Sequence, residues 1–424
     1  MKILIVGAGI GGLTAALSLH AAGIDALVID SVSELRPLGV GINLLPHATR
    51  ELIELGLGDA LAELAIPTAE AIHLDRHGNR IWGTPRGLAA GYRWPQYSIH
   101  RGELQAALLA AVRDRLGAAS VRTGLRFESF TQNTTEITGR VSDSVTGVHT
   151  VLSADAVIGA DGLNSAVRAQ LHPHEGRPLW NGIRMWRGIA EAAPFLTGRS
   201  MILAGTNSAA RLVVYPISRA AERRGRALVN WVAEVRVADT RHPTPDWNHA
   251  GQLADVLAHY AGWRFDGVEV AALMSASEQI LEYPMVDRDP LPYWGSGRVT
   301  LLGDAAHPMY PIGSNGASQA ILDGRVLARE LDAADDPIAG LAAYEAARRE
   351  TVNAIVLANR DIPMDAVLNT VAERAPEGFD RIEDVLSAAE LAAIAAGYDR
   401  TTGTDAEALN NRPSLSPPKR QHAE

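Results

Sequence analysis

A short apolar run at the start of the chain ends in three glycines with a fixed spacing. Val6 is followed by Gly7-x-Gly9-x-x-Gly12, and an Ala- and Leu-rich stretch with a helical pattern comes next. Gly7 permits a tight turn, Gly9 lets the backbone approach a pyrophosphate, and Gly12 lets the helix pack closely on the strand. Gly11 lies in the same turn, and free N–H groups at the helix start attract phosphate. The pattern therefore predicts the start of a dinucleotide-binding unit.

A second apolar run ends in an acid at the position that such a unit requires. Residues 27–30 are typical of a buried strand, and Asp30, with Ser31 beside it, is expected to hold the ribose of the dinucleotide. The glycine motif alone is a weak signal, but strand, turn, helix, strand and acid all agree. The alternative is a glycine-rich turn without a ligand.

The composition excludes several classes of protein. The chain has 424 residues, no cysteine and a formal net charge of −10. The absence of cysteine excludes disulfides, thiolate metal sites and a cysteine nucleophile, and the negative charge argues against nucleic acid as a partner. No apolar run is long enough to cross a membrane, and glycines interrupt the first run, unlike a signal peptide. We therefore expect a cytoplasmic protein without nucleic-acid, membrane or metal partners.

The order of the predicted strands and helices indicates an α/β (α+β) chain with two sheets. A Rossmann-like dinucleotide-binding domain is expected from residues 1–73, 98–178 and 280–335. An inserted domain with an antiparallel β-sheet is expected from residues 74–97 and 179–279, because β-branched and aromatic runs gather there.

The last part of the chain is expected to change character twice. Residues 336–400 have a helical pattern and are predicted to form a C-terminal helical region. Residues 401–424 lack an apolar period and end in a polar run that contains prolines, so we expect a disordered tail.

Two further motifs that contain glycine and aspartate follow buried strands. The first is Gly159-Ala-Asp161-Gly162, and the second is Gly303-Asp304, followed by a loop that leads into a long helix. An aspartate at the carboxyl end of a strand lies where ligands bind in α/β sheets. With the first glycine motif, these sequences resemble the single-component FAD-dependent aromatic hydroxylases, the p-hydroxybenzoate hydroxylase family. The resemblance covers nearly all of residues 1–400.

Within that family the chain is most similar to the phenazine-pathway hydroxylases. The stretches that carry this similarity are 36–43, 95–104, 283–292 and 301–324. The resemblance implies an FAD-binding domain, an inserted substrate-binding sheet and a substrate that is a planar aromatic small molecule of secondary metabolism or aromatic catabolism.

The resemblance also implies roles for residues in the second and third motifs. Asp304 is expected to accept a hydrogen bond from a ribityl hydroxyl of FAD; the alternative is an aspartate that caps a helix. Backbone N–H groups in the turn formed by Gly313, Asn315 and Gly316 are expected to face the N1–C2 carbonyl edge of the flavin. Asp161 is either a residue that faces FAD or NAD(P)H or a purely structural one.

Two more FAD contacts are implied outside these motifs. Gly41 lies in a glycine-containing loop that is expected beside the flavin. Arg101 begins a predicted helix that does not need a positive side chain there, so it is expected to reach the phosphates or the ribityl chain. The alternative for Arg101 is a solvated surface arginine.

The chain has no second Gly-x-Gly-x-x-Gly motif for a nicotinamide cofactor. NADH or NADPH is therefore expected to visit a surface cleft transiently, and the sequence does not separate the two. The family chemistry implies that reduced flavin and O2 form a C4a-hydroperoxide, which hydroxylates the substrate with or without loss of a carboxylate. One alternative is a flavin-dependent epoxidase, N-hydroxylase or Baeyer–Villiger enzyme with a polyketide-like substrate. A second alternative is a flavoprotein that is not an oxygenase, such as a dehydrogenase or an FAD-retaining binding protein. The protein is expected to be a monomer or a homodimer.

The substrate is expected between the inserted sheet and the flavin. Arg211 and Tyr215 share one strand face by alternation, and Arg211 is expected to face a carboxylate or phenolate. Trp186 and Trp231 are expected on neighbouring strands beside them. The remaining candidates are Tyr310 and Pro311, in the loop by the flavin. The alternatives are an exposed edge arginine for Arg211 and sheet core for the two tryptophans.

His47 is the single candidate for an acid–base residue. It lies near the start of a predicted helix after the Gly41 loop, so it could deprotonate a phenolic substrate. The alternative is packing at the helix N-terminus.

Overall fold

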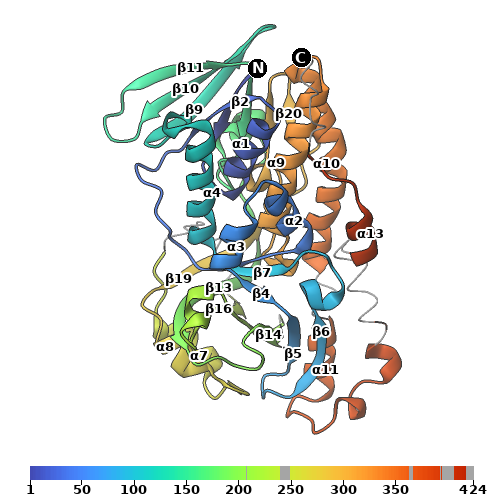
Figure 1. Ribbon diagram of the computed structural model, residues 1–424. Coiled ribbons are helices and arrows are strands. Elements are labelled where there is room, and N and C mark those ends of the chain that lie inside the picture. Colours follow the sequence, from blue (N-terminus) through green and yellow to red (C-terminus); the bar gives the residue numbers. More distant parts are fainter. Residues whose placement is uncertain (207, 239–248, 362–365, 392, 394–404, 417–424) are drawn as a thin grey trace.

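The computed structural model of the chain describes residues 1–206, 208–238, 249–361, 366–391, 393 and 405–416. It contains two large sheets, each with its own helices. In Figure 1 the first sheet and its helices form the upper part, and the second sheet lies below them. The long helix α10 (Pro337–Asp361) runs along one side of the upper part toward the lower one.

The first sheet has a Rossmann-like order of strands. Its members, in spatial order, are β20 (Gly295–Ser296), β21 (Val299–Leu301), β12 (Ala156–Gly159), β1 (Lys2–Val6), β2 (Asp25–Ile29) and β8 (Val121–Arg122). All neighbours pair in parallel except β20 and β21. The central strands β1, β12 and β21 are almost wholly apolar and buried, as parallel strands covered on both faces require.

Helices and a smaller sheet pack against this first sheet. The helices are α1 (Ile10–Ala21), α4 (Arg101–Leu116), α5 (Ala166–Leu171) and α9 (Asn315–Ala333), with α10 packed on α9. The smaller antiparallel sheet is β9 (Leu125–Gln132), β10 (Ile137–Asp143) and β11 (His149–Ala154), which contacts β1 and β12. One continuous apolar core joins these elements.

The second sheet has seven strands. They are, in spatial order, β19 (Ile280–Asp287), β13 (Leu179–Ala192), β16 (Ala227–Arg236), β15 (Ala210–Pro216), β14 (Ser200–Gly205), β5 (Glu70–Leu74) and β6 (Arg80–Pro85). Only the β5–β14 pair is parallel. The short helices α7 (Leu253–Tyr260) and α8 (Val270–Ser275) share a core with one face. The predicted α/β class with an antiparallel second sheet is confirmed.

Two predicted boundaries of the inserted sheet are wrong. The sequence division assigned residues 280–335 and 1–73 to the first domain, but β19 pairs with β13, and β5 pairs with β14. Both strands therefore belong to the second sheet. An apolar strand does not reveal which sheet it joins, because pairing is decided by residues that are distant in the sequence.

A small three-stranded sheet lies between the two large ones. It consists of β3 (Gly41–Leu44), β7 (Gln96–His100) and β4 (Ile66–Thr68). The helices near it are α2 (Pro46–Glu54), α3 (Gly58–Leu64) and α6 (Arg219–Arg223). β3 contacts both α9 and the loop before it. This sheet brings β3, which begins at Gly41, next to α9 and the loop before it.

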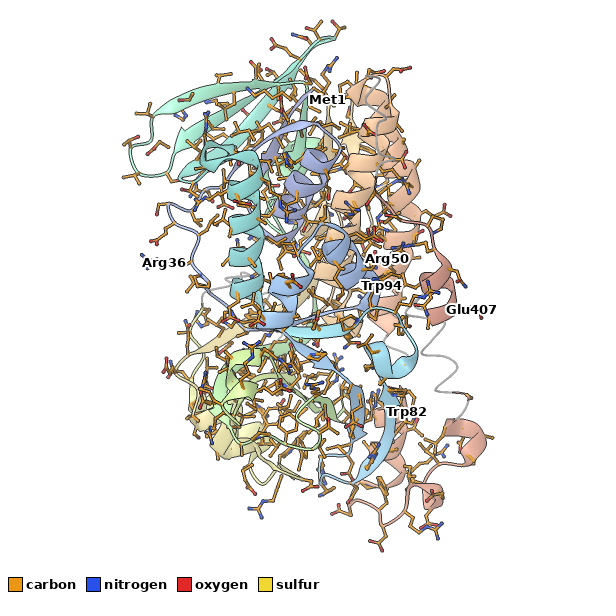
Figure 2. The ribbon with its side chains drawn as sticks, viewed as in Figure 1. Met1, Arg36, Arg50, Trp82, Trp94 and Glu407 are labelled. Atoms are coloured by element: carbon orange, nitrogen blue, oxygen red, sulfur yellow. The ribbon has the colours of Figure 1, made fainter. Side chains whose placement is uncertain are left out.

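The end of the chain departs from the predicted disordered tail. Residues 405–416 contain α13 (Ala406–Asn411), capped by Asp405, with Leu409 and Leu415 buried. Figure 2 shows Glu407 of α13 on the same side as Arg50 and Trp94, and the Arg50 guanidinium lies 4.7 Å from the Trp94 ring centre. The segment docks mainly through charges on α2, which local composition cannot show. Residues 394–404 and 417–424 lie outside the described residues.

The predicted helical region from residue 336 to 400 contains α10 and α11 (Ala366–Arg374) within its described part. Among the described residues, no helix is both long and apolar enough to cross a membrane. The same residues contain no group of three or more His, Asp or Glu side chains that could hold a metal ion.

Candidate active site

The glycine turn between β1 and α1 has the close contacts that the sequence predicts. Gly7 has a φ of +108°, which glycine adopts without strain. A Cβ atom at Gly12 would lie 2.0 Å from the carbonyl oxygen of Gly7, whereas a Cβ atom at Gly9 would meet nothing within 4 Å. No side chain caps the first N–H groups of α1, so they and the space beside Gly9 are open to a pyrophosphate. Gly11 instead lets α1 approach Leu302.

Asp30 ends β2 beside this turn. Its Oδ2 atom accepts a hydrogen bond of 2.8 Å from the N–H of Ala8, and its Oδ1 atom accepts one of 3.0 Å from the N–H of Val32. The carboxylate is partly exposed, so it can hold the turn and still accept a further hydrogen bond. The neighbouring Ser31 is exposed.

Gln105 is a residue at this turn that the sequence reasoning missed. Its Nε2 atom donates a hydrogen bond of 2.7 Å to the carbonyl oxygen of Ala8. Gln105 lies one helical turn after Arg101 on α4, and Arg101 is exposed at the start of that helix. The helical spacing of these two residues is the signal that could have identified Gln105.

Asp304 and the start of α9 come together after β21. Asp304 is exposed, although Gly303 and Ala305 on either side of it are buried. A Cβ atom at Gly316 would have the Oδ1 atom of Asp304 as its nearest neighbour, at 4.0 Å. The placement of Asp304 and the start of α9 therefore agrees with the prediction that the two lie in one site.

The turn before α9 is held in an uncommon conformation. Gly313 has a φ of +68° and Ser314 a φ of +60°, which a residue other than glycine rarely adopts. Ser314 makes no side-chain cap, so it leaves the first N–H groups of α9 without a side-chain acceptor at the cap position. Asn315, the first residue of α9, is buried. Such a helix start can stabilise negative charge on a ligand.

A buried network that the sequence reasoning missed fixes this loop. Asp323, on α9, accepts hydrogen bonds from the N–H of Gly303 at 3.1 Å and from the Nε atom of Arg348 at 2.8 Å. The Nε2 atom of His307 lies 2.6 Å from the same carboxylate. Burial alone would raise the pKa of Asp323, but His307 and Arg348 together lower it to about 2. The ionised Asp323 thereby ties the Asp304 turn to α9 and α10.

Asp161 has a structural role in the geometry. Its carboxylate accepts a hydrogen bond of 2.5 Å from the Ser165 hydroxyl and one of 2.7 Å from the N–H of Ala166, at the start of α5. Burial raises the pKa of Asp161. These bonds occupy both of its oxygens and agree with the structural alternative that the sequence left open.

Arg168, on α5, reaches across to the Asp304 turn. Its Nη1 atom donates hydrogen bonds to the carbonyl oxygens of Ala305 at 2.9 Å and Ala306 at 2.8 Å. Its other nitrogens pair with Glu175. Arg168 therefore fixes the same loop as Asp323.

Gly41 joins the upper part of the molecule to the second sheet. Its N–H donates a hydrogen bond of 2.7 Å to the Oδ1 atom of Asn230, and its carbonyl oxygen accepts one of 2.9 Å from the Tyr215 hydroxyl. A Cβ atom at Gly41 would lie 2.7 Å from side-chain atoms of Asn230 and Ile217. Only glycine permits this approach.

Arg187 completes this junction and was missed in the sequence. Its Nη2 atom donates a hydrogen bond of 2.5 Å to the carbonyl oxygen of Gly41, and its Nη1 atom donates one of 3.1 Å to the Tyr283 hydroxyl. The alternation of β13 places it in phase with Ile183, Met185 and Ile189. An arginine within that apolar set was the available signal.

The two predicted tryptophans face away from this junction. Trp186 and Trp231 are fully buried in the core that the second sheet shares with α7 and α8. Trp186 donates a hydrogen bond to Glu282, and Trp231 donates one to Ser277. Strand alternation puts them on the sheet face opposite Arg187, so the geometry does not favour the expectation that they border the substrate. They form sheet core, as the alternative held.

Arg211 shares a face with Tyr215, as the sequence predicts, but it is buried rather than at an exposed edge. Its Nη1 atom lies 3.1 Å from the Oε2 atom of Glu234, and both side chains are almost wholly buried. The charge of Arg211 is therefore already balanced by a carboxylate, and it is a weaker anchor for an anionic ligand than Arg187.

The loop residues Tyr310 and Pro311 differ in exposure. Tyr310 is buried with Met185, Tyr283 and other apolar residues of the second sheet, whereas Pro311 is exposed. Burial, and then the charge of Asp287, raise the pKa of Tyr310 to about 12. Tyr310 therefore keeps its proton and links the loop before α9 to β13 and β19.

His47 is poorly suited to act as a base. It is buried at the second position of α2, and burial, together with the charges of Arg412 and Arg348, lowers its pKa to about 3. A general base works best with a pKa near the working pH. The geometry favours the alternative of packing at the helix start.

Comparisons with known proteins agree with this arrangement. Residues 1–359 match the model of a family described as an FAD binding domain. The chain is 52% identical over 399 residues to the phenazine 1,6-dicarboxylic acid hydroxylase PhzS of Lysobacter antibioticus, with 93% of this chain and 96% of the relative covered. It is 31% identical over 354 residues to 3-hydroxybenzoate 6-hydroxylase 1 of Aquipseudomonas alcaligenes, with 82% and 84% covered.

Solved structures share the fold over almost the whole chain. HpxO of Klebsiella pneumoniae, complexed with FAD and uric acid, matches with a TM-score of 0.72 at 25% identity, and the match covers 97% of this chain and 95% of HpxO. A substrate complex of salicylate hydroxylase matches with a TM-score of 0.72 at 22% identity, over 98% and 99% of the two chains, which shows the common fold.

The residues of the first domain fit FAD. The space beside Gly9 suits a pyrophosphate, Asp304 presents an exposed carboxylate, and the uncapped start of α9 suits a ring that gains negative charge. The predictions of FAD, of the family and of the enzyme class are confirmed by the comparisons. The chain belongs to the FAD-dependent aromatic hydroxylases, the p-hydroxybenzoate hydroxylase family, and is a flavin-dependent monooxygenase.

Proposed function

We propose that the enzyme hydroxylates a flat, fused-ring aromatic acid of the phenazine type at the junction of Gly41, Tyr215 and Arg187. The observation that carries this proposal is Arg187, a cation that contacts Gly41 and lies on the same sheet face as the apolar residues Leu203, Val213 and Val232. A guanidinium there can pair with a carboxylate of the substrate. Support comes from the relative at 52% identity, which is named for a phenazine dicarboxylic acid.

The proposed reaction consumes one NAD(P)H and one O2 for each substrate. For a ring C–H bond the balance is Ar–H + O2 + NAD(P)H + H⁺ → Ar–OH + H2O + NAD(P)⁺. For loss of a carboxylate it is Ar–COO⁻ + O2 + NAD(P)H + 2 H⁺ → Ar–OH + CO2 + H2O + NAD(P)⁺. FAD, when bound, supplies the oxygen activation.

We propose that FAD lies along the first domain. The glycine turn at Gly9 would hold the pyrophosphate, Asp30 the ribose, and Arg101 the phosphates or the ribityl chain. Asp304 would accept a hydrogen bond from a ribityl hydroxyl, and the N–H groups at the start of α9 would face the flavin ring. Asp161 would act by holding α5.

The residues of the junction would orient the substrate and exclude water. The apolar face formed by Leu203, Val213 and Val232 would lie against one surface of the ring system. Tyr310 stays protonated and bonds to Asp287, so it would hold the loop before α9 in place rather than act as a base. No residue of the junction is needed as a base for the oxygen transfer itself.

We also propose that the enzyme works in the cytoplasm, where NADH and NADPH are available, as a monomer or a homodimer. The first sheet with its helices would be the FAD-binding domain, and the second sheet would be the substrate-binding domain. The separate apolar cores of the two sheets support this division.

Substrate-stimulated oxidation of NAD(P)H tests the proposal. The FAD-loaded protein would be mixed with NADH or NADPH and either phenazine carboxylic acids or single-ring hydroxybenzoic acids. We expect the phenazine acids to stimulate oxidation of NAD(P)H. By the two balances, the product should be about 16 mass units heavier than the substrate, or about 28 lighter where a hydroxyl replaces a carboxylate. Stimulation by single-ring acids alone would reject the phenazine class.

A further inference from the structure

His73, on β5, is a buried side chain that the proposed reaction does not use. It is fully buried, and neither of its ring nitrogens has a hydrogen-bond partner among the residues that the structure describes. Buried polar atoms are almost always paired, and an unpaired one costs roughly 1–3 kcal/mol. A histidine with two such atoms is therefore expected to have a partner that is not part of the described chain, such as a ligand.

The pairing of the strands places His73 on the same sheet face as Arg187. His73 pairs with Leu203 of β14, Leu203 with Val213 of β15, Val213 with Val232 of β16, and Val232 with Arg187 of β13. Directly paired residues of neighbouring strands point to the same face. One row therefore runs across five strands, with polar residues at its two ends and three apolar residues between them.

The length of this row suits a fused-ring ligand. Four strand spacings of about 4.8 Å separate the backbones of His73 and Arg187 by roughly 19 Å. The two side chains occupy part of that span, and the remaining length is similar to that of two or three fused rings. Arg187 and Ile189 on this face keep partial exposure, whereas His73 has none.

The surroundings of His73 favour an anion. The guanidinium groups of Arg86 and Arg211 lie close enough to His73 to lower its pKa, and Glu234 balances the charge of Arg211. Burial, and then these two cations, lower the pKa of His73 to about 3, so the imidazole is neutral and can donate one hydrogen bond. Trp82, labelled on β6 in Figure 2, stacks on the imidazole with ring centres 5.0 Å apart and orients it.

We propose that His73 donates a hydrogen bond to a second carboxylate of the substrate, so that the site selects flat aromatic diacids whose carboxylates lie at opposite ends. Arg187 takes the carboxylate next to the Gly41 loop, and His73 takes the distant one. This inference rests on the proposed function and adds a specificity residue to it. A purely structural histidine would be expected to have a protein partner for at least one nitrogen.

Binding of two related acids to three proteins tests this role. The probes are phenazine-1-carboxylic acid and phenazine-1,6-dicarboxylic acid, and the proteins are the wild type, His73→Leu and His73→Gln. The dissociation constants would be measured by the change in flavin absorbance at neutral pH. FAD content and the thermal midpoint of each protein would show whether the variant is folded.

The ratio of the two dissociation constants is the decisive quantity. We expect the wild type to bind the diacid at least about tenfold more tightly than the monoacid, as a hydrogen bond to a charged group allows. His73→Leu should weaken the diacid alone and bring the ratio close to one, and His73→Gln, which keeps a donor, should retain part of the preference. A lost fold would lower both affinities together and leave the ratio unchanged.

Other outcomes would overturn the assignment. Equal binding of the two acids by the wild type would do so, even if the leucine variant does not fold. An unchanged ratio in a folded His73→Leu protein would also reject it. If both acids are hydroxylated but bind equally, only the role of His73 fails. If neither acid binds and a single-ring acid is hydroxylated, the phenazine class of the proposed function fails as well.

Discussion

The guanidinium group of Arg187 donates a hydrogen bond of 2.5 Å to the carbonyl oxygen of Gly41. This contact joins a strand of the second sheet to the start of β3, although 146 residues separate the two positions. The side chain that we propose to bind the substrate is thereby fixed to the backbone of β3, which contacts α9 and the loop before it. In the proposed site, one residue would couple the position of the substrate to that of the cofactor.

Removal of this cation should weaken substrate binding selectively. In Arg187→Met we expect the KM for an aromatic acid to rise by about 10-fold to 100-fold, because a charge-assisted hydrogen bond is lost. The matched control is Arg184→Met, since Arg184 lies on the same strand but in phase with Trp186 on the other face. That variant should change KM by less than about twofold. Steady-state kinetics with an aromatic acid would measure both, and equal effects would contradict the assignment.

Substitution of two glycines in the turn between β1 and α1 should have two different effects. Gly9→Ala puts a methyl group into open space, so the protein should keep its thermal midpoint but lose FAD affinity by about tenfold or more. Gly12→Ala places a methyl group 2.0 Å from the Gly7 carbonyl oxygen, so it should be destabilised by about 1–3 kcal/mol or more. Thermal melting and flavin absorbance separate the two. A Gly9→Ala protein with full FAD affinity would show that the pyrophosphate lies elsewhere.

These glycines also show what the sequence could predict. The glycine turn, Asp304 and the start of α9 are local patterns, and local spacing determines their geometry. Arg187 lies on one face of the second sheet, and Trp186 and Trp231 lie on the other. Which face each takes depends on the register of β13 against its neighbours, which no single strand encodes.

The C-terminal segment shows the same limit more sharply. Its stretch from 405 to 416 has two buried leucines, two alanines and a proline among otherwise polar residues, so its composition resembles a disordered tail. It is ordered by Arg412, which pairs with the buried Glu51 of α2. The network of His307, Asp323 and Arg348 likewise links residues from three separate elements. Such contacts appear only in the folded chain.

Acid should weaken the network around Asp323. The pKa of Asp323 in the folded chain is about 2, below the ordinary value of 3.8. A lowered carboxyl pKa contributes stability that is present above about pH 4 and is lost as the pH falls toward 2, by about 2 kcal/mol in total. Asp323→Asn should remove this part of the pH dependence. It should also cost about 3–5 kcal/mol at neutral pH, because Arg348 then lacks its charge partner.

Urea unfolding of both proteins between about pH 2.5 and about pH 7, a range set by the pKa of Asp323, would measure this effect. The exposed Asp25→Asn variant is the control and should follow the wild type. If the stability difference between the wild type and Asp323→Asn is the same at about pH 3 as at about pH 6, Asp323 is not the source of the acid sensitivity.

The pair formed by Arg412 and Glu51 should hold the C-terminal segment in place. Arg412→Met leaves the fully buried Glu51 with Arg325 as its remaining partner in the described residues, so we expect a loss of about 2–4 kcal/mol in the free energy of unfolding. The comparison variant Arg36→Met breaks an exposed pair with Glu34 and should cost less than about 1 kcal/mol. Thermal or urea unfolding would distinguish them. Similar small losses in both variants would mean that the segment is not held by this pair.

The source of the oxygen atom in the product tests the monooxygenase reaction on this substrate class most directly. FAD-loaded protein would be supplied with NADH or NADPH, phenazine-1,6-dicarboxylic acid and ¹⁸O2, and the product would be analysed by mass spectrometry. We predict one ¹⁸O atom in each hydroxylated product, formed with one NAD(P)H consumed. A product that contains only ¹⁶O, or NAD(P)H oxidation that yields hydrogen peroxide without any hydroxylated product, would contradict it.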